Sequence, residues 1–271
     1  MKRIRKLAYV SLAIAVIAID APTADGELGD LFASLTGTGV NGGGFVYRYA
    51  TTGAQSIVAS GLSRPNGVAV DHFGNLFVAT TTLDGTSYEP TILKITPSGV
   101  QTTFASVGGN LFLLGLASDS PGNLFIMALD IPNFTSTIYK FTPGGVQSTF
   151  GSIPSQGFGL AFDEAGNLFA ADAFDQSIFK FALDGTRSVF VGPSAFVPDT
   201  GPAGLAFDTF GNLFVSMSRM LLIGNDTILK FSPEGVESTF ATGLTFPRGL
   251  AFDRSGNLFV ADVDGAGLER S

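Results

Sequence analysis

Short apolar segments alternate with polar turns along almost the whole chain, and this pattern repeats. The clearest marker is the tetrapeptide Gly-Asn-Leu-Phe, which occurs five times, with a Gly-Asp-Leu-Phe variant starting at Gly29. Successive markers lie 44 to 48 residues apart, and the five copies start at Gly74, Gly122, Gly166, Gly211 and Gly256. A fixed period of this length is typical of propellers, solenoids and other repeat architectures.

The copy at residues 159–190 shows the local structure that each repeat is expected to adopt. Residues 159–163 are predicted to form a strand that ends in an Asp-x-x-Gly-Asn turn. In such a turn the aspartate bonds the backbone and the glycine takes the left-handed conformation. Residues 167–172 form the returning strand, 178–181 a third, and an Asp-Gly or Pro-x-Gly turn leads to a fourth. Each repeat is therefore predicted to be a four-stranded antiparallel meander.

The apolar residues of one meander lie on two faces, so a single unit cannot bury them. The units must stack, and radial stacking produces a β-propeller. Of the 26 phenylalanines, 16 fall at equivalent repeat positions, which predicts an aromatic core between neighbouring blades. The predicted fold is an all-β propeller of four-stranded antiparallel blades.

The number of blades depends on the two ends of the chain. Four complete repeats are expected at 65–106, 113–152, 157–192 and 202–242. The first blade lacks its innermost strand, and the last has two strands followed by a fragment at 267–271. Six markers favour six blades with an incomplete last blade, which suggests a truncated C-terminus. The alternative is five blades, with the C-terminal inner strand completing the first.

The phrase Pro-x-Gly-[Leu/Val]-Ala-[Phe/Val]-Asp-x-x-Gly-Asn-Leu-Phe starts at Pro65, Pro202 and Pro247 and resembles the NHL repeat. The resemblance covers nearly everything from Gly29 onward, and the chain lacks the signatures of WD40 and kelch blades. It implies a six-bladed propeller of the exported bacterial type, related to the gluconolactonase and regucalcin-like proteins.

The first 24 residues are predicted to be a secretory signal peptide. Four cations, at positions 2, 3, 5 and 6, precede an uncharged apolar run from Leu7 to Ile19. This run is shorter than the roughly 20 residues of a membrane span, although a membrane anchor or a buried first strand are alternatives. We expect cleavage near Ala24, a single propeller domain at 25–271, secretion or a periplasmic or cell-envelope location, and no stable membrane span afterwards.

Composition narrows the possible partners. The 271 residues are 45% hydrophobic and only 14% charged, with 35 glycines, which excludes intrinsic disorder and helical bundles. The absence of cysteine excludes disulfides and thiolate metal sites. The net charge of −8, which becomes −11 without the leader, argues against a nucleic-acid partner. We expect a monomer whose partner is a small molecule, a glycan or a protein.

Ligands of propellers usually sit at the mouth of the central channel, so we define the mouth positions as the residues just before the inner-strand glycines. They are Asn66, Leu114, Phe158, Ala203 and Arg248. The lactonase resemblance implies oxygen ligands for a metal at such positions, and only Asn66 matches. We therefore expect no metal, no cofactor and no catalytic residue.

The ligand-binding residues expected at the mouth are Asn66, Arg248, Asp172 and Asp262, the last two because they end second strands. The variable loops 81–90, 129–136, 173–177 and 218–226 are expected to surround them. Five aspartates of the Asp-x-x-Gly-Asn turns and His72 are expected to be structural; the aspartates are Asp71, Asp119, Asp163, Asp208 and Asp253.

Three functions follow as hypotheses. The first is an exported binding or interaction module rather than an enzyme. The alternative is a metal-dependent lactonase-like hydrolase or lyase, and the third is a structural component of the cell envelope.

Overall fold

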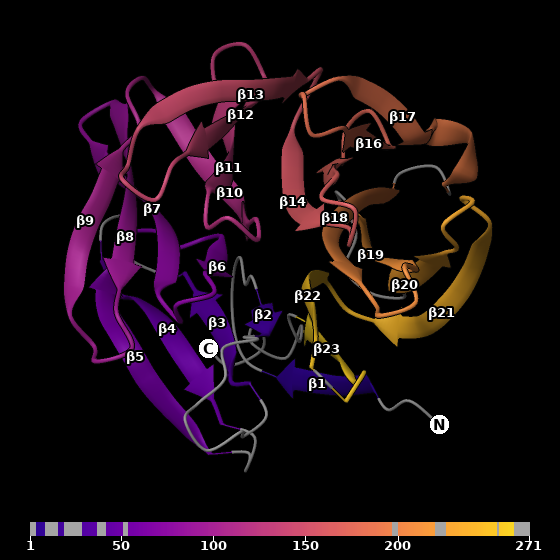
Figure 1. Cartoon of the computed structure of the whole chain (residues 1–271), viewed down its shortest axis with the longest axis horizontal. Coiled ribbons are helices and arrows are strands. Elements are labelled where there is room, and N and C mark those ends of the chain that lie inside the picture. Colours follow the sequence, from indigo (N-terminus) through magenta and orange to yellow (C-terminus); the bar gives the residue numbers. More distant parts are fainter. Residues whose placement is uncertain are drawn as a thin grey trace, which may run out of the picture.

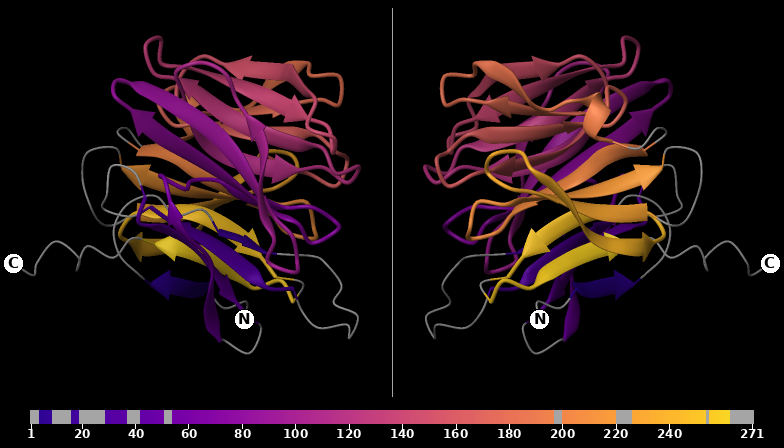
Figure 2. Two further views of the ribbon diagram at one scale, coloured as in Figure 1. Left: turned by 90° about the vertical axis from the view of Figure 1, so that its left-hand side faces the viewer. Right: turned by 90° about the vertical axis from the view of Figure 1, so that its right-hand side faces the viewer.

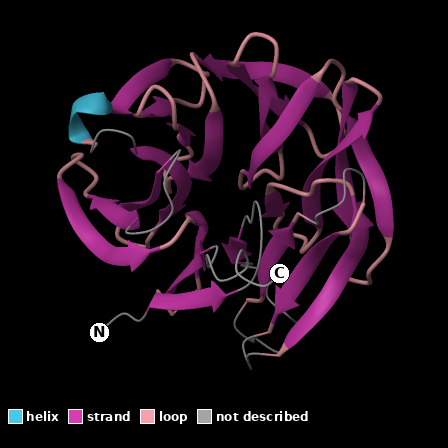
Figure 3. Cartoon of the chain, turned by 180° about the vertical axis from the view of Figure 1, so that it is seen from behind, coloured by secondary structure: helices cyan, strands magenta, loops and turns pink. Residues whose placement is uncertain are grey.

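A computed structural model of the chain describes residues 4–8, 16–18, 29–36, 42–50, 54–196, 200–219, 226–253 and 255–262. Within these ranges the protein consists of β-sheets arranged around a centre (Figure 1), with one short 3-10 helix, η1 (Pro193–Ala195), coloured cyan in Figure 3. The side views in Figure 2 show the hairpin turns at two opposite faces of this ring. The all-β propeller predicted from the repeat is confirmed.

Five sheets have four antiparallel strands each, in chain order from the centre outward. The first contains β2 (Val16–Ala18), β3 (Leu31–Leu35), β4 (Gly44–Tyr49) and β5 (Gln55–Leu62). The second contains β6 (Val68–Val70), β7 (Leu76–Asp84), β8 (Ser87–Ile95) and β9 (Gln101–Ser106). The third contains β10 (Leu111–Ser118), β11 (Leu124–Asp130), β12 (Thr135–Phe141) and β13 (Gln147–Ile153).

The remaining two four-stranded sheets follow the same plan. The fourth contains β14 (Gly157–Phe162), β15 (Leu168–Asp172), β16 (Ser177–Phe181) and β17 (Arg187–Val191). The fifth contains β18 (Thr200–Phe207), β19 (Leu213–Arg219), β20 (Asp226–Phe231) and β21 (Glu237–Leu244). The second to fifth sheets coincide with the four complete repeats expected from the sequence.

The last marker belongs to a three-stranded sheet of β22 (Pro247–Phe252), β23 (Leu258–Asp262) and β1 (Ile4–Ala8). Its third strand, β1, runs parallel to β23, which no blade of the predicted kind allows. The complete four-stranded blades therefore number five, as in the alternative prediction, and not the favoured six.

Two strands lie inside the segment predicted to be an export signal. β2 takes the innermost position of the first sheet, for which no strand was predicted from the sequence, and pairs antiparallel with β3.

The C-terminal inner strand, β22, does not complete the first sheet as the five-blade alternative supposed, because it pairs with β23 in its own sheet. The prediction that residues 1–24 are an export signal stays a prediction. Residues 263–271, where a third C-terminal strand was expected, lie outside the described residues.

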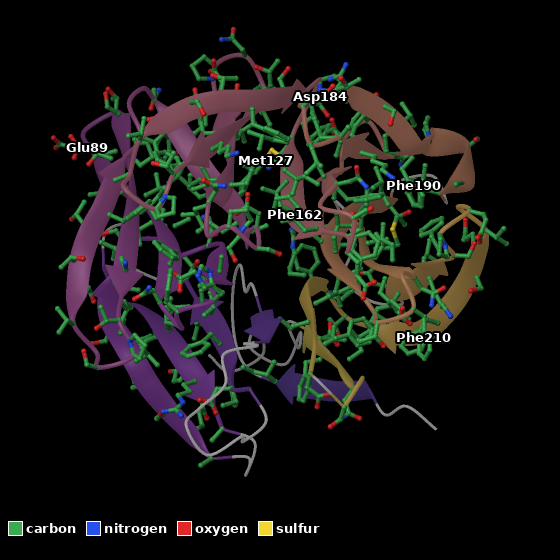
Figure 4. All side chains as sticks on the ribbon, in the orientation of Figure 1. Glu89, Met127, Phe162, Asp184, Phe190 and Phe210 are labelled. Carbon is green, nitrogen blue, oxygen red and sulfur yellow. The ribbon has the colours of Figure 1, made fainter. Side chains whose placement is uncertain are left out.

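Rings of phenylalanine fill the spaces between sheets, as predicted. Phe125 of β11 packs edge to face on Phe150 of its own sheet and on Phe162 of the next, with centroids 4.9 and 5.0 Å away. Lys140, directly opposite on β12, places its ammonium 5.4 Å from the centroid of the Phe125 ring. The same arrangement recurs around Phe169 and Phe214. Figure 4 shows Met127 and Phe162 within the body of the ring and Glu89 at its outer edge.

The inner strands follow one another around the centre in the order β2, β6, β10, β14, β18 and β22, and β22 neighbours β2. Their glycines allow this close approach. A Cβ atom on Gly204 of β18 would lie 1.8 Å from the Arg248 carbonyl oxygen, and one on Gly67 would lie 2.1 Å from that of Leu114. The inner-strand glycine of the repeat is thus required by the neighbouring backbone.

Candidate functional site at the channel mouth

Strand pairing shows which residues share the mouth. Gly157, at the start of inner strand β14, pairs with Asp172, at the end of β15, and Pro247 pairs with Asp262 in the same way. The mouth positions and the connections between second and third strands therefore lie on one face of the ring. The Asp-x-x-Gly-Asn turns lie at the other end of the same strands, as predicted.

The turns on that opposite face have the structural role expected of them. Asp71 accepts hydrogen bonds from the backbone N–H groups of Phe73 and Asn75, at 3.0 and 2.8 Å, and Gly74 has a φ of +77°. Asp119, Asp163, Asp208 and Asp253 each bond the asparagine four residues on in the same way. These carboxylates are used by their own turns.

A β-bulge sets the direction of the chain at the mouth. The register of the first two strands shifts between Leu113 and Leu116, and again between Gly157 and Leu160. Equivalent shifts occur between Pro202 and Leu205 and between Pro247 and Leu250. Each shift contains a mouth position, and a bulge re-aims the side chains that it contains.

Arg248 is the charged residue among the mouth positions, and two aromatic rings hold it. Its guanidinium carbon lies 4.7 Å from the centroid of Phe158, in the fourth sheet, and 4.2 Å from that of Phe246. The fifth sheet lies between the sheet of Phe158 and the sheet of Arg248, and its mouth position is Ala203. The side chain of Ala203 is small and buried, which leaves Arg248 space to reach Phe158. Phe158, expected from sequence only to prevent metal binding, is therefore a contact of the cation.

Burial also changes the electrostatics of Arg248. Loss of hydration lowers its pKa to about 10, and attraction by Asp226, at the start of β20, opposes this shift only in part. Asp226 itself is buried. The guanidinium is still charged at neutral pH, but it carries its charge with less water around it than a surface arginine has.

The backbone of Arg248 is held in place by a serine of the preceding sheet. The Ser216 hydroxyl donates to the Arg248 carbonyl oxygen at 2.7 Å and accepts from the Gly204 N–H at 2.7 Å. Hydroxyls bridge other neighbouring sheets in a similar way: Ser34 donates to the Asn66 carbonyl oxygen, and the Ser136 hydroxyl accepts from the Gly157 N–H at 3.0 Å. The sequence carries no signal for these bridges, because Ser34 and Ser216 stand at ordinary strand positions and Ser136 falls at the end of the variable loop 129–136.

Asn66 is buried and points to its neighbour in the ring. Its side-chain amide donates to the Leu113 carbonyl oxygen at 2.9 Å, and its backbone N–H donates to the Ala79 carbonyl oxygen at 2.9 Å. The described contacts of Arg248 do not include Asn66. That both residues bind a ligand stays a prediction.

Asp172 and Asp262 cap the loops that lead into inner strands. Asp172 is 0% exposed and accepts from the Ser155 hydroxyl, from the Ser155 N–H at 3.1 Å and from the Asp175 N–H at 3.0 Å. Burial raises the pKa of Asp172 despite these hydrogen bonds. Asp262 accepts from the backbone N–H groups of Thr245 and Phe246 at 2.9 and 2.8 Å, which positions the Phe246 backbone beside Arg248.

One of the variable loops is a strand extension instead. Residues 81–90 belong mostly to β7 and β8, which pair as far as Asp84 and Ser87 and form a long hairpin. The run of consecutive threonines at 80–82 resembles a loop in sequence, but here it continues the ladder. The connections at 129–136 and 173–177 contain short turns, and residues 220–225 of the fourth loop lie outside the described residues.

The mouth residues do not fit a divalent cation of the lactonase kind. The side chains of Leu114, Phe158 and Ala203 have no ligating atom and Arg248 is a cation, so Asn66 alone among the five could offer a side-chain oxygen, fewer than a divalent cation requires. Among the described residues, no three histidine, aspartate or glutamate side chains gather in a group that could hold a metal ion. No helix in the described ranges is long and apolar enough to span a membrane.

No family model and no curated protein matches the chain. Solved structures do match its fold. A gluconolactonase from Xanthomonas campestris is 17% identical with a TM-score of 0.67, and the match covers 93% of this chain and 84% of that one. A putative gluconolactonase is 17% identical with a TM-score of 0.65, and the match covers 96% of this chain and 93% of that one. Virginiamycin B lyase from Staphylococcus aureus is 14% identical with a TM-score of 0.60, and the match covers 92% of this chain and 82% of that one. At these identities the likeness shows the propeller fold alone.

Proposed function

We propose that this protein binds a small molecule at the mouth of its central channel, with Arg248 as the principal contact. The observation that carries the proposal is the position of Arg248: a partly buried cation beside two aromatic rings, on the face of the ring where the mouth positions lie. Pockets that combine apolar walls with a few polar groups are typical small-molecule sites.

The other expected ligand-binding residues act on the ligand indirectly in this proposal. Asp262 fixes the loop that carries Phe246, and Asp172 fixes the loop that leads to Phe158. Asn66 ties the second sheet to the third. All three are positioning residues, and Arg248 with its two rings contacts the ligand.

A second candidate is an enzyme of the lactonase or lyase kind. The solved structures described above support it over a pure binding module, because they include gluconolactonases and lyases. The mouth residues lack the set of oxygen ligands that a metal-dependent lactonase would need, so we derive no catalytic step. Both candidates place the small molecule at the same mouth.

One experiment separates these possibilities. The purified protein is screened by thermal shift against sugar lactones and the corresponding acids, each with calcium, with zinc and with a chelator, while ring opening is followed by acid release. Stabilisation without turnover supports the binding module, and turnover that requires a divalent ion supports the lactonase. A protein that responds to no compound under any condition would leave the structural role as the better explanation.

We further propose that the protein is exported, on the order of cations and apolar residues in 1–24. The test is the N-terminal sequence of the protein recovered from the periplasm or medium of an expressing bacterium. An intact first residue in the cytoplasmic fraction would contradict export.

The three-stranded sheet takes the sixth place of the ring in this proposal. Its inner strand, β22, lies next to both β18 and β2, which is where a sixth blade would stand. This placement also puts Arg248, on β22, within the ring of mouth positions.

A further inference from the structure

The two rings that hold Arg248 restrict the direction from which a polar partner can reach it. The guanidinium group is flat, and its five N–H donors lie in its plane. Phe158 and Phe246, with centroids 4.7 and 4.2 Å from the guanidinium carbon, interact through the π-cloud and bring no hydrogen-bond acceptor. A partner that accepts hydrogen bonds must therefore approach the edge of the guanidinium.

The charge around Arg248 favours an anion at that edge. Burial removes water from the cation, and Asp226 compensates for this only in part. The described contacts of the guanidinium are the two rings and the charge of Asp226. We take the N–H donors at its edge as the groups that meet the ligand. Burial removes the water molecules that accept hydrogen bonds from an exposed guanidinium. An anion would replace these acceptors and would also supply a negative charge.

The geometry points to a carboxylate: we propose that the ligand of the mouth carries a carboxylate group, which Arg248 binds edge-on through two parallel N–H···O bonds. This inference rests on the proposed function. A carboxylate is planar and has a single negative charge, which matches one guanidinium fork. A phosphate dianion would call for a second cation, and the described contacts of Arg248 include none.

Arg64 provides the matched control for a general effect of positive charge. It precedes Asn66 by two residues, and its guanidinium also lies over an aromatic ring, 5.6 Å from the centroid of Tyr88. It therefore resembles Arg248 in residue type, in its aromatic contact and in its place near the start of an inner strand, but Phe158 and Phe246 do not flank it.

The test compares matched probes on the full chain. Titrations use benzoate and gluconate as carboxylates, benzamide as the uncharged counterpart, and inorganic phosphate, on the wild type, Arg248→Gln, Arg248→Lys and Arg64→Gln. We expect a carboxylate to bind the wild type and Arg64→Gln equally. Arg248→Gln should weaken it about tenfold to a hundredfold, the size of one charged hydrogen-bonded pair. Arg248→Lys, which keeps the charge and loses the fork, should be intermediate.

A pH series adds a second readout. Because the pKa of Arg248 is about 10, carboxylate binding should weaken as the pH rises through that value. Circular dichroism and the melting temperature of each variant without ligand show whether it is folded, and Arg248→Lys serves if Arg248→Gln does not fold.

Several outcomes would overturn the inference. Equal binding of benzoate and benzamide, tighter binding of phosphate, or carboxylate binding that Arg248→Gln and Arg248→Lys leave unchanged would each do so. A neutral lactone that binds the mouth independently of Arg248 would overturn the carboxylate and leave the small-molecule site standing. If no probe or lactone binds, both proposals fail.

Discussion

At the scale of single residues, buried polar groups at the mouth do structural work that their chemistry alone does not reveal. Asp172 and Asp262 are carboxylates near a channel mouth, yet their oxygens are occupied by backbone N–H groups of the adjoining loops. Arg248 differs because its described partners are aromatic faces and a nearby carboxylate. The contacts that a side chain makes, rather than its residue type, show whether it stabilises a loop or is a candidate to bind a ligand.

The buried carboxyl group of Asp172 predicts a pH-dependent effect on stability. Burial raises the pKa of Asp172, so the folded state holds its proton more tightly than the unfolded chain does. Its contribution to the free energy of unfolding is then largest in acid and falls as the pH rises through the raised pKa. Asp172→Asn removes this dependence, so the difference in melting temperature between wild type and variant should shrink as the pH rises above about 4, the ordinary pKa of an aspartate.

Asp184→Asn is the matched control for Asp172→Asn. Hydrogen bonds from Thr186 lower the pKa of this exposed carboxyl group, so its contribution is present at neutral pH and is lost in acid. Its melting-temperature difference should therefore change in the opposite direction. The same trend in both variants would show that Asp172 does not act as described.

At the scale of elements, the second strand of each blade and its phenylalanine connect neighbouring sheets. Phe125, Phe169 and Phe214 each touch one ring of their own sheet and one of the next. The lysine on the third strand covers the same ring. Loss of one such ring removes contacts on two sheets at once.

We expect Phe125→Ala to lower the free energy of unfolding by about 3–5 kcal/mol, because a large buried side chain is replaced by a cavity. Phe210→Ala is the control, since Phe210 is 73% exposed on a turn, and it should change stability by less than about 0.5 kcal/mol. Chemical denaturation measures both. A small loss for Phe125→Ala would mean that the ring is not part of a packed core.

The close contact between neighbouring inner strands leads to a second prediction about the elements. Gly204→Ala would place a methyl group 1.8 Å from the Arg248 carbonyl oxygen, so the two inner strands must separate. We expect a loss of about 1–3 kcal/mol or more, together with a change at the mouth. Gly108→Ala is the control, because no atom lies within 4 Å of the added Cβ. Equal stability of the two variants would contradict the close contact.

Much of the fold is predictable from these elements because the repeat uses local chemistry. The Asp-x-x-Gly-Asn turns form from residues only four positions apart, and the phenylalanines keep the phase of the repeat. The partners of Arg248 could not be predicted in this way. Phe158 belongs to a sheet two places earlier in the ring, and Phe246 stands just before the repeat phrase, so the repeat pattern alone does not show that both rings meet Arg248.

At the scale of the whole molecule, the ring closes through the start of the chain. β1 extends the last sheet and β2 fills the inner place of the first, so the two strands span the junction between chain ends. This closure is not predictable from the sequence, because cations followed by an apolar run are typical of a leader. The same residues are therefore expected to direct export and are seen to pair with both terminal sheets.

Removal of residues 1–24 tests this closure. The shortened chain loses β1 and β2, which leaves one edge of β3 and one edge of β23 without their neighbours, and unpaired edges promote association. We expect a lower melting temperature and a larger oligomer fraction by light scattering than for a chain lacking only residues 1–3. If the two shortened chains behave alike, β1 and β2 are dispensable and the leader interpretation gains support.

The contact between inner-strand glycines and neighbouring carbonyl groups has a consequence for how this ring could change in size. Each such contact sets the angle through which one sheet is turned from the next, and it does so with backbone atoms that cannot repack as side chains do. Insertion of a duplicated repeat would require a smaller turn at every junction. The diameter of the ring is thus a collective property of its glycines, and a change in repeat number needs coordinated adjustment around the whole circle.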